Sequence, residues 1–408
     1  MRAHSRGHQL VPVAHTKTTI TRRGLADADG AVRARLTAHA VSAQTLGESS
    51  TVDSWYWIAV ELDAPDPTLL GALEARLDDV GAMRAAPALP MRRLFADRLD
   101  GLKPSSRPRV RLHRKATAAE TVCAALRAQV RALRDLDAPV RRAEPDAVHQ
   151  MRVATRRLRA MLRAFGQVVD RDATADLYAE LRWLSGVLAE ARDQEVVQQR
   201  VEALLHDTPA DQVLGPIAAQ LTRQFARDQA EAHARVLDEL DTDRYATLLD
   251  ALERLVSDPP LTPLAARRGR DLLPRMVGKV ARRVDRAMAA ADREPEGPER
   301  DAALHGVRKA ARRARYAAET VVPLLGGDAR RTAQRFEQMG DVLGDHHDTV
   351  RTRALLRTLG AQGHGEGHNG FTFGLWHERE AHAAQRIEAE LPAIWRAASR
   401  GKQRRWMS

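Results

Sequence analysis

A short basic segment occurs twice in this chain of 408 residues, with the same spacing of histidine and arginine in each copy. The first copy reads HQMRVATRRLR at residues 149–159, and the second reads HGVRKAARRAR at residues 305–315. An α-helix advances about 100° per residue, so the basic residues of each copy fall on one side and the apolar residues on the other. The sequence therefore predicts two matching helices, each of which buries one side and presents guanidinium groups on the other.

The basic side of each helix has no acidic residue inside the motif. None occurs between His149 and Arg163, or between His305 and Arg315. Glu319 stands where the first copy has Arg163, so we expect the second basic stripe to be shorter or partly paired. A run of charge is ordinarily a solvated helix face, but the recurrence of the same face favours binding of a dense polyanion over that interpretation.

Charge is distributed unevenly along the chain. Residues 1–100 contain 12 basic and 12 acidic residues, so the whole excess of +11 lies in residues 101–408. Only 6 of the 65 basic residues are lysine. Arginine offers a planar fork of donors that can meet two phosphate oxygens, whereas lysine acts as a point charge. The placement of these arginines indicates a phosphate-rich partner for the C-terminal part of the chain.

From Thr117 onward the sequence predicts helices arranged as two copies of one unit. Residues 117–137 match 270–291, loops at 141–146 and 292–300 precede the motif helices, and residues 209–240 and 371–398 close each copy. A third helix leads to Arg192-Asp193 in the first copy and to His346-His347-Asp348 in the second. We expect two antiparallel bundles with pseudo-two-fold symmetry, repeat one at about 117–262 and repeat two at about 270–400, after a linker at 101–116.

Residues 1–100 predict a small α+β region. Stretches at 18–21, 31–36 and 55–62 have the pattern of strands, and turn-forming residues separate them. A helix is expected to open near Asp66-Pro67, with Leu69, Leu73 and Leu77 on one side.

The doubled histidine–arginine motif in an all-helical chain resembles the CHAD family of histidine-signature helical domains, over roughly residues 117–400. The resemblance implies a mainly α fold of two four-helix bundles, whose basic faces line a central groove or pore and bind inorganic polyphosphate, in some members at polyphosphate granules. The polyphosphate-binding residues it implies here, none of them catalytic, are His149, Arg152, Arg156, Arg157, Arg159, Arg163, His305, Arg308, Lys309, Arg312, Arg313 and Arg315.

The N-terminal hundred residues resemble part of a CYTH domain, the triphosphate tunnel fold. Residues 41–48, 55–62 and 69–79 carry this resemblance. The Glu-x-Glu-x-Lys strand that supplies metal carboxylates in that family is absent, and a closed tunnel needs more strands. We therefore expect a degenerate region without triphosphatase activity. If such activity were retained, Glu48, Glu61 and Asp63 would be its few acidic candidates.

Other residues of the repeats have more than one interpretation. His149 and His305 either donate to phosphate or hold the loop before the helix, and the neighbouring arginines should favour their neutral form. We expect Asp193 and Asp348 to be helix caps or partners of motif arginines. A metal site at His346-His347-Asp348 is disfavoured, because adjacent residues diverge on a helix and rarely share one ion.

The function predicted is non-catalytic binding of inorganic polyphosphate, without a cofactor or metal. The alternatives are non-specific nucleic-acid binding and CYTH-type triphosphatase activity. Aromatic residues make up only 4% of the chain, which disfavours stacking on bases. The single cysteine, Cys123, and the absence of a long apolar run indicate a cytoplasmic protein with no membrane contact.

Overall fold

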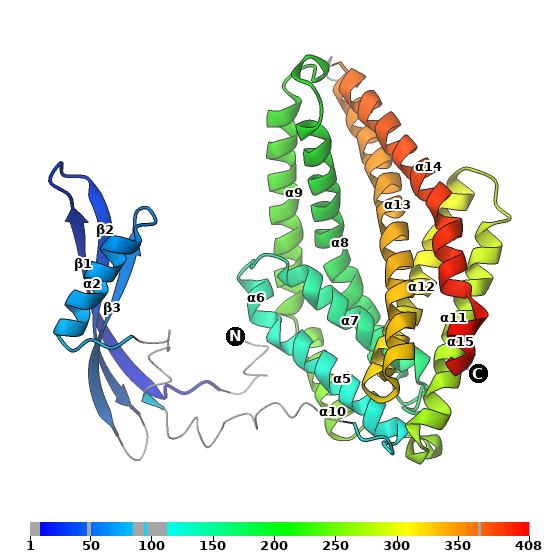
Figure 1. Cartoon of the computed structure of the whole chain (residues 1–408), viewed down its shortest axis with the longest axis horizontal. Coiled ribbons are helices and arrows are strands. Elements are labelled where there is room, and N and C mark those ends of the chain that lie inside the picture. Colours follow the sequence, from blue (N-terminus) through cyan, green and yellow to red (C-terminus); the bar gives the residue numbers. More distant parts are fainter. Residues whose placement is uncertain (1–8, 47–49, 85–93, 96–111, 366–368, 408) are drawn as a thin grey trace. The chain divides into compact units, whose positions relative to one another are not determined.

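The computed structural model of the chain describes residues 9–46, 50–84, 94–95, 112–365 and 369–407. The chain divides into an N-terminal unit, residues 7–109, and a helical unit that begins at residue 110 (Figure 1). Most of the expected linker, residues 101–111, lies outside the described residues. Within the described ranges, no helix combines the length and apolar character that crossing a bilayer requires.

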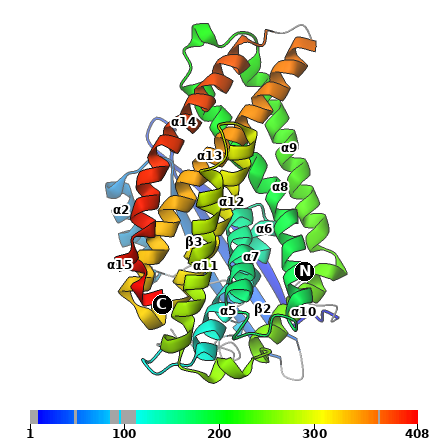
Figure 2. The same ribbon diagram turned by 90° about the vertical axis from the view of Figure 1, so that its right-hand side faces the viewer.

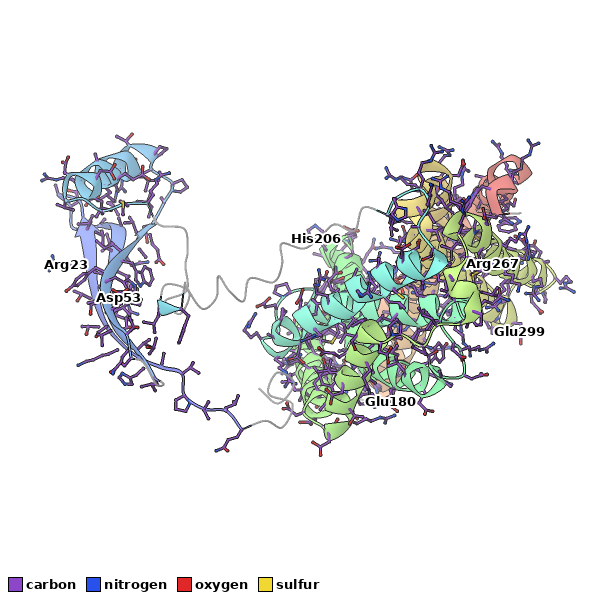
Figure 3. The ribbon with its side chains drawn as sticks, turned by 90° about the horizontal axis from the view of Figure 1, so that it is seen from below. Arg23, Asp53, Glu180, His206, Arg267 and Glu299 are labelled. Carbon is purple, nitrogen blue, oxygen red and sulfur yellow. The ribbon has the colours of Figure 1, made fainter. Side chains whose placement is uncertain are left out.

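The N-terminal unit contains a three-stranded antiparallel sheet in the order β1 (Ala14–Ala26), β2 (Val32–Thr45) and β3 (Val52–Leu62). Gly30 adopts a φ of 84° in the turn between β1 and β2, a conformation that glycine reaches without strain. Arg23 and Asp53 mark the two edge strands in Figure 3. The small sheet is consistent with a partial CYTH-like region.

A helix follows the sheet, α2 (Pro67–Asp79), and it begins where the sequence predicts. The Asp66 carboxylate caps it by accepting hydrogen bonds from the backbone N–H groups of Thr68 and Leu69, and Pro67 occupies the first turn. This N-terminus follows directly from the local sequence.

The helical unit confirms a mainly α fold built from two copies of one arrangement. The first copy contains α5 (Ala118–Asp135), α6 (Asp137–Arg141), α7 (Ala147–Ala164), α8 (Ala175–His206), α9 (Ile217–Leu240) and α10 (Asp243–Ser257). The second contains α11 (Gly269–Ala291), α12 (Pro298–Leu325), α13 (Gly327–Gly365), α14 (Phe371–Ser399) and α15 (Gly401–Arg404). The helices α5, α7, α8 and α9 correspond to α11, α12, α13 and α14, and α7 and α12 are the two motif helices.

The two copies join where their first helices begin. The segments preceding α5 and α11 form an isolated antiparallel bridge, in which the N–H of Ala118 donates to the carbonyl of Arg267 and the N–H of Gly269 donates to that of Ala116. A capping box between Thr117 and Glu120 starts α5. The end of the expected linker therefore packs within the helical unit.

One expectation about the third helix of each copy is wrong. Asp193 and Asp348 do not cap a helix, because α8 and α13 continue past them. In α8 the residues beyond Asp193 keep a helical apolar spacing, and Val197 and Val201 are buried. That burial stabilises the extra turns and leaves Asp193 in the middle of a long helix.

The two copies share one hydrophobic core rather than having one core each. Residues of α7 and α12 belong to the same cluster, among them Met151, Leu158, Val307 and Ala314, and Figure 2 shows these two helices side by side. A second, smaller cluster joins the tips of the α8–α9 and α13–α14 hairpins around Trp376. The hairpins are therefore held together at both ends.

Close packing of the C-terminus predicts an unequal response to two glycine substitutions. A Cβ at Gly278 in α11 would lie 2.6 Å from the backbone oxygen of Met407, whereas a Cβ at Gly186 in α8 would meet nothing within 4 Å. We expect Gly278→Ala to lower the free energy of unfolding by about 1–3 kcal/mol. Gly186→Ala should raise it by about 0.5–1 kcal/mol. Urea titration followed by circular dichroism measures both, and equal effects would contradict the packing described.

Candidate functional site

The helices α7 and α12 place the two arginine stripes against each other. Arg152 and Arg156 of α7 are electrostatic neighbours of Arg308 and Arg312 of α12. The two motif segments, which are 156 residues apart in the sequence, thus form one basic cluster at the junction of the copies. We call Arg152, Arg156, Arg308 and Arg312 the central arginines.

Three of the central arginines are held in an environment that disfavours their charge. Burial lowers the pKa of Arg156, Arg308 and Arg312, and repulsion among the central arginines lowers each one further. The pKa of Arg312 falls to about 9, with burial as the largest cause and Arg308 the next. At neutral pH these guanidinium groups remain charged, so the cluster stores electrostatic repulsion that a bound anion would relieve.

Several buried side-chain nitrogen atoms of the stripes have no hydrogen-bond partner among the described residues. The buried Nε atoms of Arg156 and Arg308 are two of them, and the others on the motif helices are Nδ1 of His149, Nε of Arg157, Nε of Arg159 and Nδ1 of His305. Buried donors in folded proteins are nearly always paired, so this concentration at one place is unusual. A ligand rich in acceptor oxygens would satisfy them.

Two glycines of α13 make room for the α12 arginines. A Cβ at Gly340 would lie 3.4 Å from Cγ of Arg312, and one at Gly344 would lie 3.6 Å from the guanidinium of Arg308. The arginine stems therefore lie along the small-residue side of α13. This glycine pair is a sequence signal for the site that the motif analysis missed.

A small number of acidic residues from other helices face the cluster. The Asp193 carboxylate of α8 accepts from Arg152 of α7 at 2.8 Å and pairs with Arg351 of α13 at 2.7 Å, which confirms it as a partner of a motif arginine. Asp348 is an electrostatic neighbour of Arg308, and burial raises the pKa of its carboxyl group. Arg351 was not predicted from the motif because it lies on a different helix.

Histidines lie beside the α12 stripe in an uncharged state. The rings of His305 and His347 pack with their centroids 4.0 Å apart. Burial lowers the pKa of His305 to about 4 and that of His347 to about 3, and Arg308 adds to both shifts. Burial also lowers the pKa of His149, with Arg192 the next cause. The expectation of neutral motif histidines is confirmed, although burial contributes more than the arginines do.

The flanks of the stripes are held by aromatic rings and by carboxylates. Arg159 and Arg163 lie over the ring of Tyr178, at 5.3 and 4.6 Å from its centroid. Arg163 and Tyr178 also line a cavity of about 280 Å³ at the start of α8. Tyr178 was not predicted as part of the site, because it lies outside the motif on another helix.

The other flank is partly neutralised, as the position of Glu319 suggested. The Glu319 carboxylate pairs with Arg157 of α7 at 3.1 Å and with Arg315 of α12 at 2.7 Å. Glu337 of α13 also pairs with Arg315. The expectation of a partly paired second stripe is therefore confirmed. The two remaining predicted residues, Lys309 and Arg313, are exposed on α12.

The histidine pair of α13 divides between two environments, as expected for adjacent helix residues. His347 stacks on His305, whereas His346 is buried and meets Glu388 and Asp301. In the N-terminal unit, Glu61 is exposed and Asp63 pairs with Arg35 at 3.3 Å, while Glu48 lies outside the described residues. Among the described residues, those acidic candidates form no carboxylate cluster that could hold a metal ion.

Comparisons with known proteins point to one family. The CHAD domain model matches residues 124–357. The uncharacterized proteins MT2285 and Rv2226, from Mycobacterium tuberculosis strains CDC 1551 / Oshkosh and ATCC 25618 / H37Rv, are each 32% identical to the chain over 365 residues, which is 88% of this chain and 67% of theirs.

Two solved structures resemble the chain in fold. PptA from Streptomyces chartreusis has a TM-score of 0.57 and 24% identity, and the match covers 69% of this chain and 100% of that chain. The CHAD domain from the plant Ricinus communis has a TM-score of 0.53 and 22% identity, covering 70% and 93%.

The Asp193 bridge predicts a pH-dependent loss of stability. Burial alone would raise the pKa of Asp193, but Arg152 and Arg351 outweigh it and hold the pKa below its usual value. The ionised carboxylate therefore stabilises the fold above pH of about 4, and this contribution disappears as pH falls through the native pKa. Asp193→Asn should cost about 1–3 kcal/mol at pH 7 and much less at strongly acidic pH.

Urea titration of the wild type and the variant across this pH range measures the difference. Asp341→Asn, at an exposed position of α13, provides a matched control that should cost little. A cost for Asp193→Asn that does not change between neutral and acidic pH would contradict the assignment.

Proposed function

The chain belongs to the CHAD domain family, and we propose that the facing arginines of α7 and α12 bind inorganic polyphosphate. One observation carries the proposal: the central arginines are largely buried and repel one another, and the Nε atoms of Arg156 and Arg308 have no hydrogen-bond partner among the described residues. Burial of like charges is costly unless something compensates it. A polyanion supplies both the missing charge and the missing acceptors.

The chemistry of polyphosphate suits this arrangement. Each internal phosphate carries about one negative charge and presents free oxygens, and the chain is flexible, so recognition requires repeated donors rather than a shaped pocket. Guanidinium groups pair with such oxygens in a fork geometry. Arg152 and Arg156, like Arg308 and Arg312, are one helical turn apart, so successive turns can contact different phosphates of one chain.

We propose that Asp193 and Glu319 act as internal counterions. Each carboxylate joins the two copies, Asp193 through Arg152 and Arg351 and Glu319 through Arg157 and Arg315. Arg152 is itself one of the central arginines, and the other arginines of these pairs lie beside the cluster. Phosphate oxygens can replace the carboxylates as partners of these guanidinium groups. In this proposal the acids limit the repulsion in the unliganded protein without occupying the centre of the cluster.

The proposal assigns no reaction to the chain, and it places binding at the helical unit, with association at polyphosphate granules as one setting. A CYTH-type triphosphatase is the enzymatic alternative. Its signature would be release of phosphate from tripolyphosphate with Mg²⁺ or Mn²⁺, abolished by Glu61→Gln. No release of phosphate by the full chain in this assay would contradict the enzymatic alternative.

Substitution of one central arginine should separate binding from stability. We expect Arg312→Gln to weaken polyphosphate binding at least about tenfold, because a charge-assisted hydrogen bond contributes about 1.5–3 kcal/mol. The same change should leave the free energy of unfolding unchanged or raise it, since it removes a buried, repelled cation. Calorimetric titration and urea unfolding measure the two effects.

The control for this experiment is Arg330→Gln on α13, which makes the same change of net charge at an exposed position. It should alter binding less than about twofold. If Arg312→Gln and Arg330→Gln weaken binding equally, the central arginines are not the binding site.

Salt and competition should distinguish polyphosphate from nucleic acid. Contacts from four arginines predict that log K falls with log salt concentration with a slope of about −3. Unlabelled polyphosphate should displace labelled duplex DNA far more effectively than DNA displaces polyphosphate, because the central arginines are too buried to follow a stiff duplex. Fluorescence anisotropy measures both. A flat salt response, or the reverse order of displacement, would overturn the proposal.

A further inference from the structure

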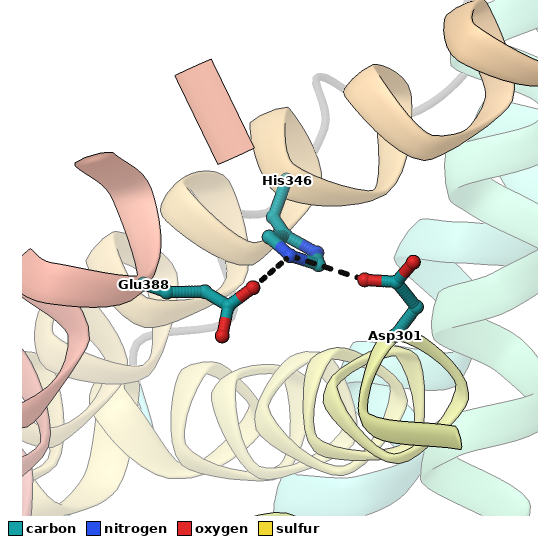
Figure 4. Close-up of side chains that lie close together, drawn as sticks. All are labelled: Asp301, His346 and Glu388. Atoms are coloured by element: carbon teal, nitrogen blue, oxygen red, sulfur yellow. Dashed lines mark hydrogen bonds and ion pairs between the residues drawn. The ribbon is translucent and has the colours of Figure 1, made fainter. Parts of the chain in front are cut away.

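A second group of charged residues lies in the second copy, on helices α12, α13 and α14. Asp301, His346 and Glu388 come from one helix each and converge on a single point, with one ligating atom of each within 4.8 Å of the others (Figure 4). The Nε2 atom of His346 lies 3.1 Å from Oε1 of Glu388 and 3.5 Å from Oδ1 of Asp301. We propose that these three side chains bind a divalent transition-metal ion of the Zn²⁺ type.

The separations of His346 from the two carboxylates suit such an ion. Nitrogen and oxygen ligands lie about 2.0–2.2 Å from zinc, which places neighbouring ligands of a tetrahedral site roughly 3.3–3.5 Å apart. The two separations from Nε2 of His346 bracket this value closely. One imidazole and two carboxylates are also the ligand types that Zn²⁺ accepts, and three protein ligands leave the fourth position for water.

The carboxylates are already oriented by residues behind them. Arg300 donates to Oε2 of Glu388 at 2.6 Å, and Arg353 donates to Oδ2 of Asp301 at 3.3 Å. Each acid therefore turns its other oxygen toward His346. This division, one oxygen for a supporting residue and one for the metal, is the arrangement found behind the ligands of metal sites.

The helical repeat does not require these residues. If the two copies are aligned on their motif histidines, Pro145 is the residue equivalent to Asp301. If they are aligned on Asp193 and Asp348, Ala191 is the residue equivalent to His346. The first copy folds in the same way with neither ligand. In addition, α12 begins earlier relative to its motif than α7 does, and this extension carries Arg300 and Asp301.

Burial of these three side chains has a free-energy cost. The side chain of His346 is only 2% exposed, and those of Asp301 and Glu388 are 20% and 22% exposed. Placing three polar or charged groups among packed helices costs free energy that an apolar set would not incur. A bound ion would join α12, α13 and α14 at one point and would stabilise the second copy, independently of polyphosphate.

The test is titration of the chelator-treated, tag-free full chain with Zn²⁺ and, separately, with Mg²⁺. We expect one tight Zn²⁺ site for each chain, a higher unfolding temperature with Zn²⁺, and no comparable effect of Mg²⁺. His346→Gln and Glu388→Gln should each weaken Zn²⁺ binding at least about tenfold. Calorimetry measures the stoichiometry and affinity, and thermal unfolding measures the stabilisation.

A matched control lies on the same helix as Glu388. His382 and Glu378 form an exposed pair on α14 with 3.2 Å between Nε2 and Oε1, so His382→Gln removes a surface histidine beside a carboxylate. It should leave the tight site intact. The proposal is overturned if the wild type takes up no tightly bound Zn²⁺, or if His382→Gln and His346→Gln have the same effect. If His346→Gln loses its helical circular dichroism, the binding of Zn²⁺ by Asp301→Asn and Glu388→Gln tests the proposal instead. The visible absorption of bound Co²⁺ then reports whether the ion lies at this site.

Discussion

The electrostatic repulsion among four arginines at the α7–α12 contact is the constraint on which the rest of the helical unit depends. Arg156, Arg308 and Arg312 have lowered pKa values because burial and mutual repulsion both disfavour their charge. Two apolar clusters hold this contact together, one at the base of the helices and one at the hairpin tips. Along α8 and α13 the polar residues of the site lie between these clusters, so hydrophobic packing on both sides offsets the cost of the charge in the middle.

The surroundings of the cluster moderate its charge without cancelling it. Asp193 and Glu319 each pair with arginines from both copies, and they do so at the sides of the cluster. His305 and His347 stay neutral because protonation beside Arg308 is unfavourable. A bound polyanion would make the local potential less positive, and it would therefore raise the pKa of these two rings. The rings of His305 and His347, which add no positive charge to the free protein, would then become additional donors to the bound phosphates.

The sequence predicted the helical repeat because its signals are local. Amphipathic spacing around Leu158 and Val307 is enough to place the two motif helices, and Asp66-Pro67 is enough to start α2. The site was predicted on the motif helices, and outside them only as a possible pairing of Asp193 with a motif arginine. Asp193 in mid-helix, Tyr178 over Arg163, and the trio around His346 depend on which helices are neighbours, and tertiary packing decides that. Gly340 and Gly344 carried a usable signal, since a glycine pair one turn apart in a long helix indicates a close approach.

The central claim is that two basic stripes form one binding site, and the stoichiometry of binding tests it most directly. Calorimetric titration of the full chain with polyphosphates of defined length should give one bound chain for each protein molecule. The affinity should rise with chain length until the ligand spans the arginines of both α7 and α12, and then level off. Two equivalent and independent sites for each molecule, with an affinity that does not depend on length, would show that the copies bind separately and would contradict the account.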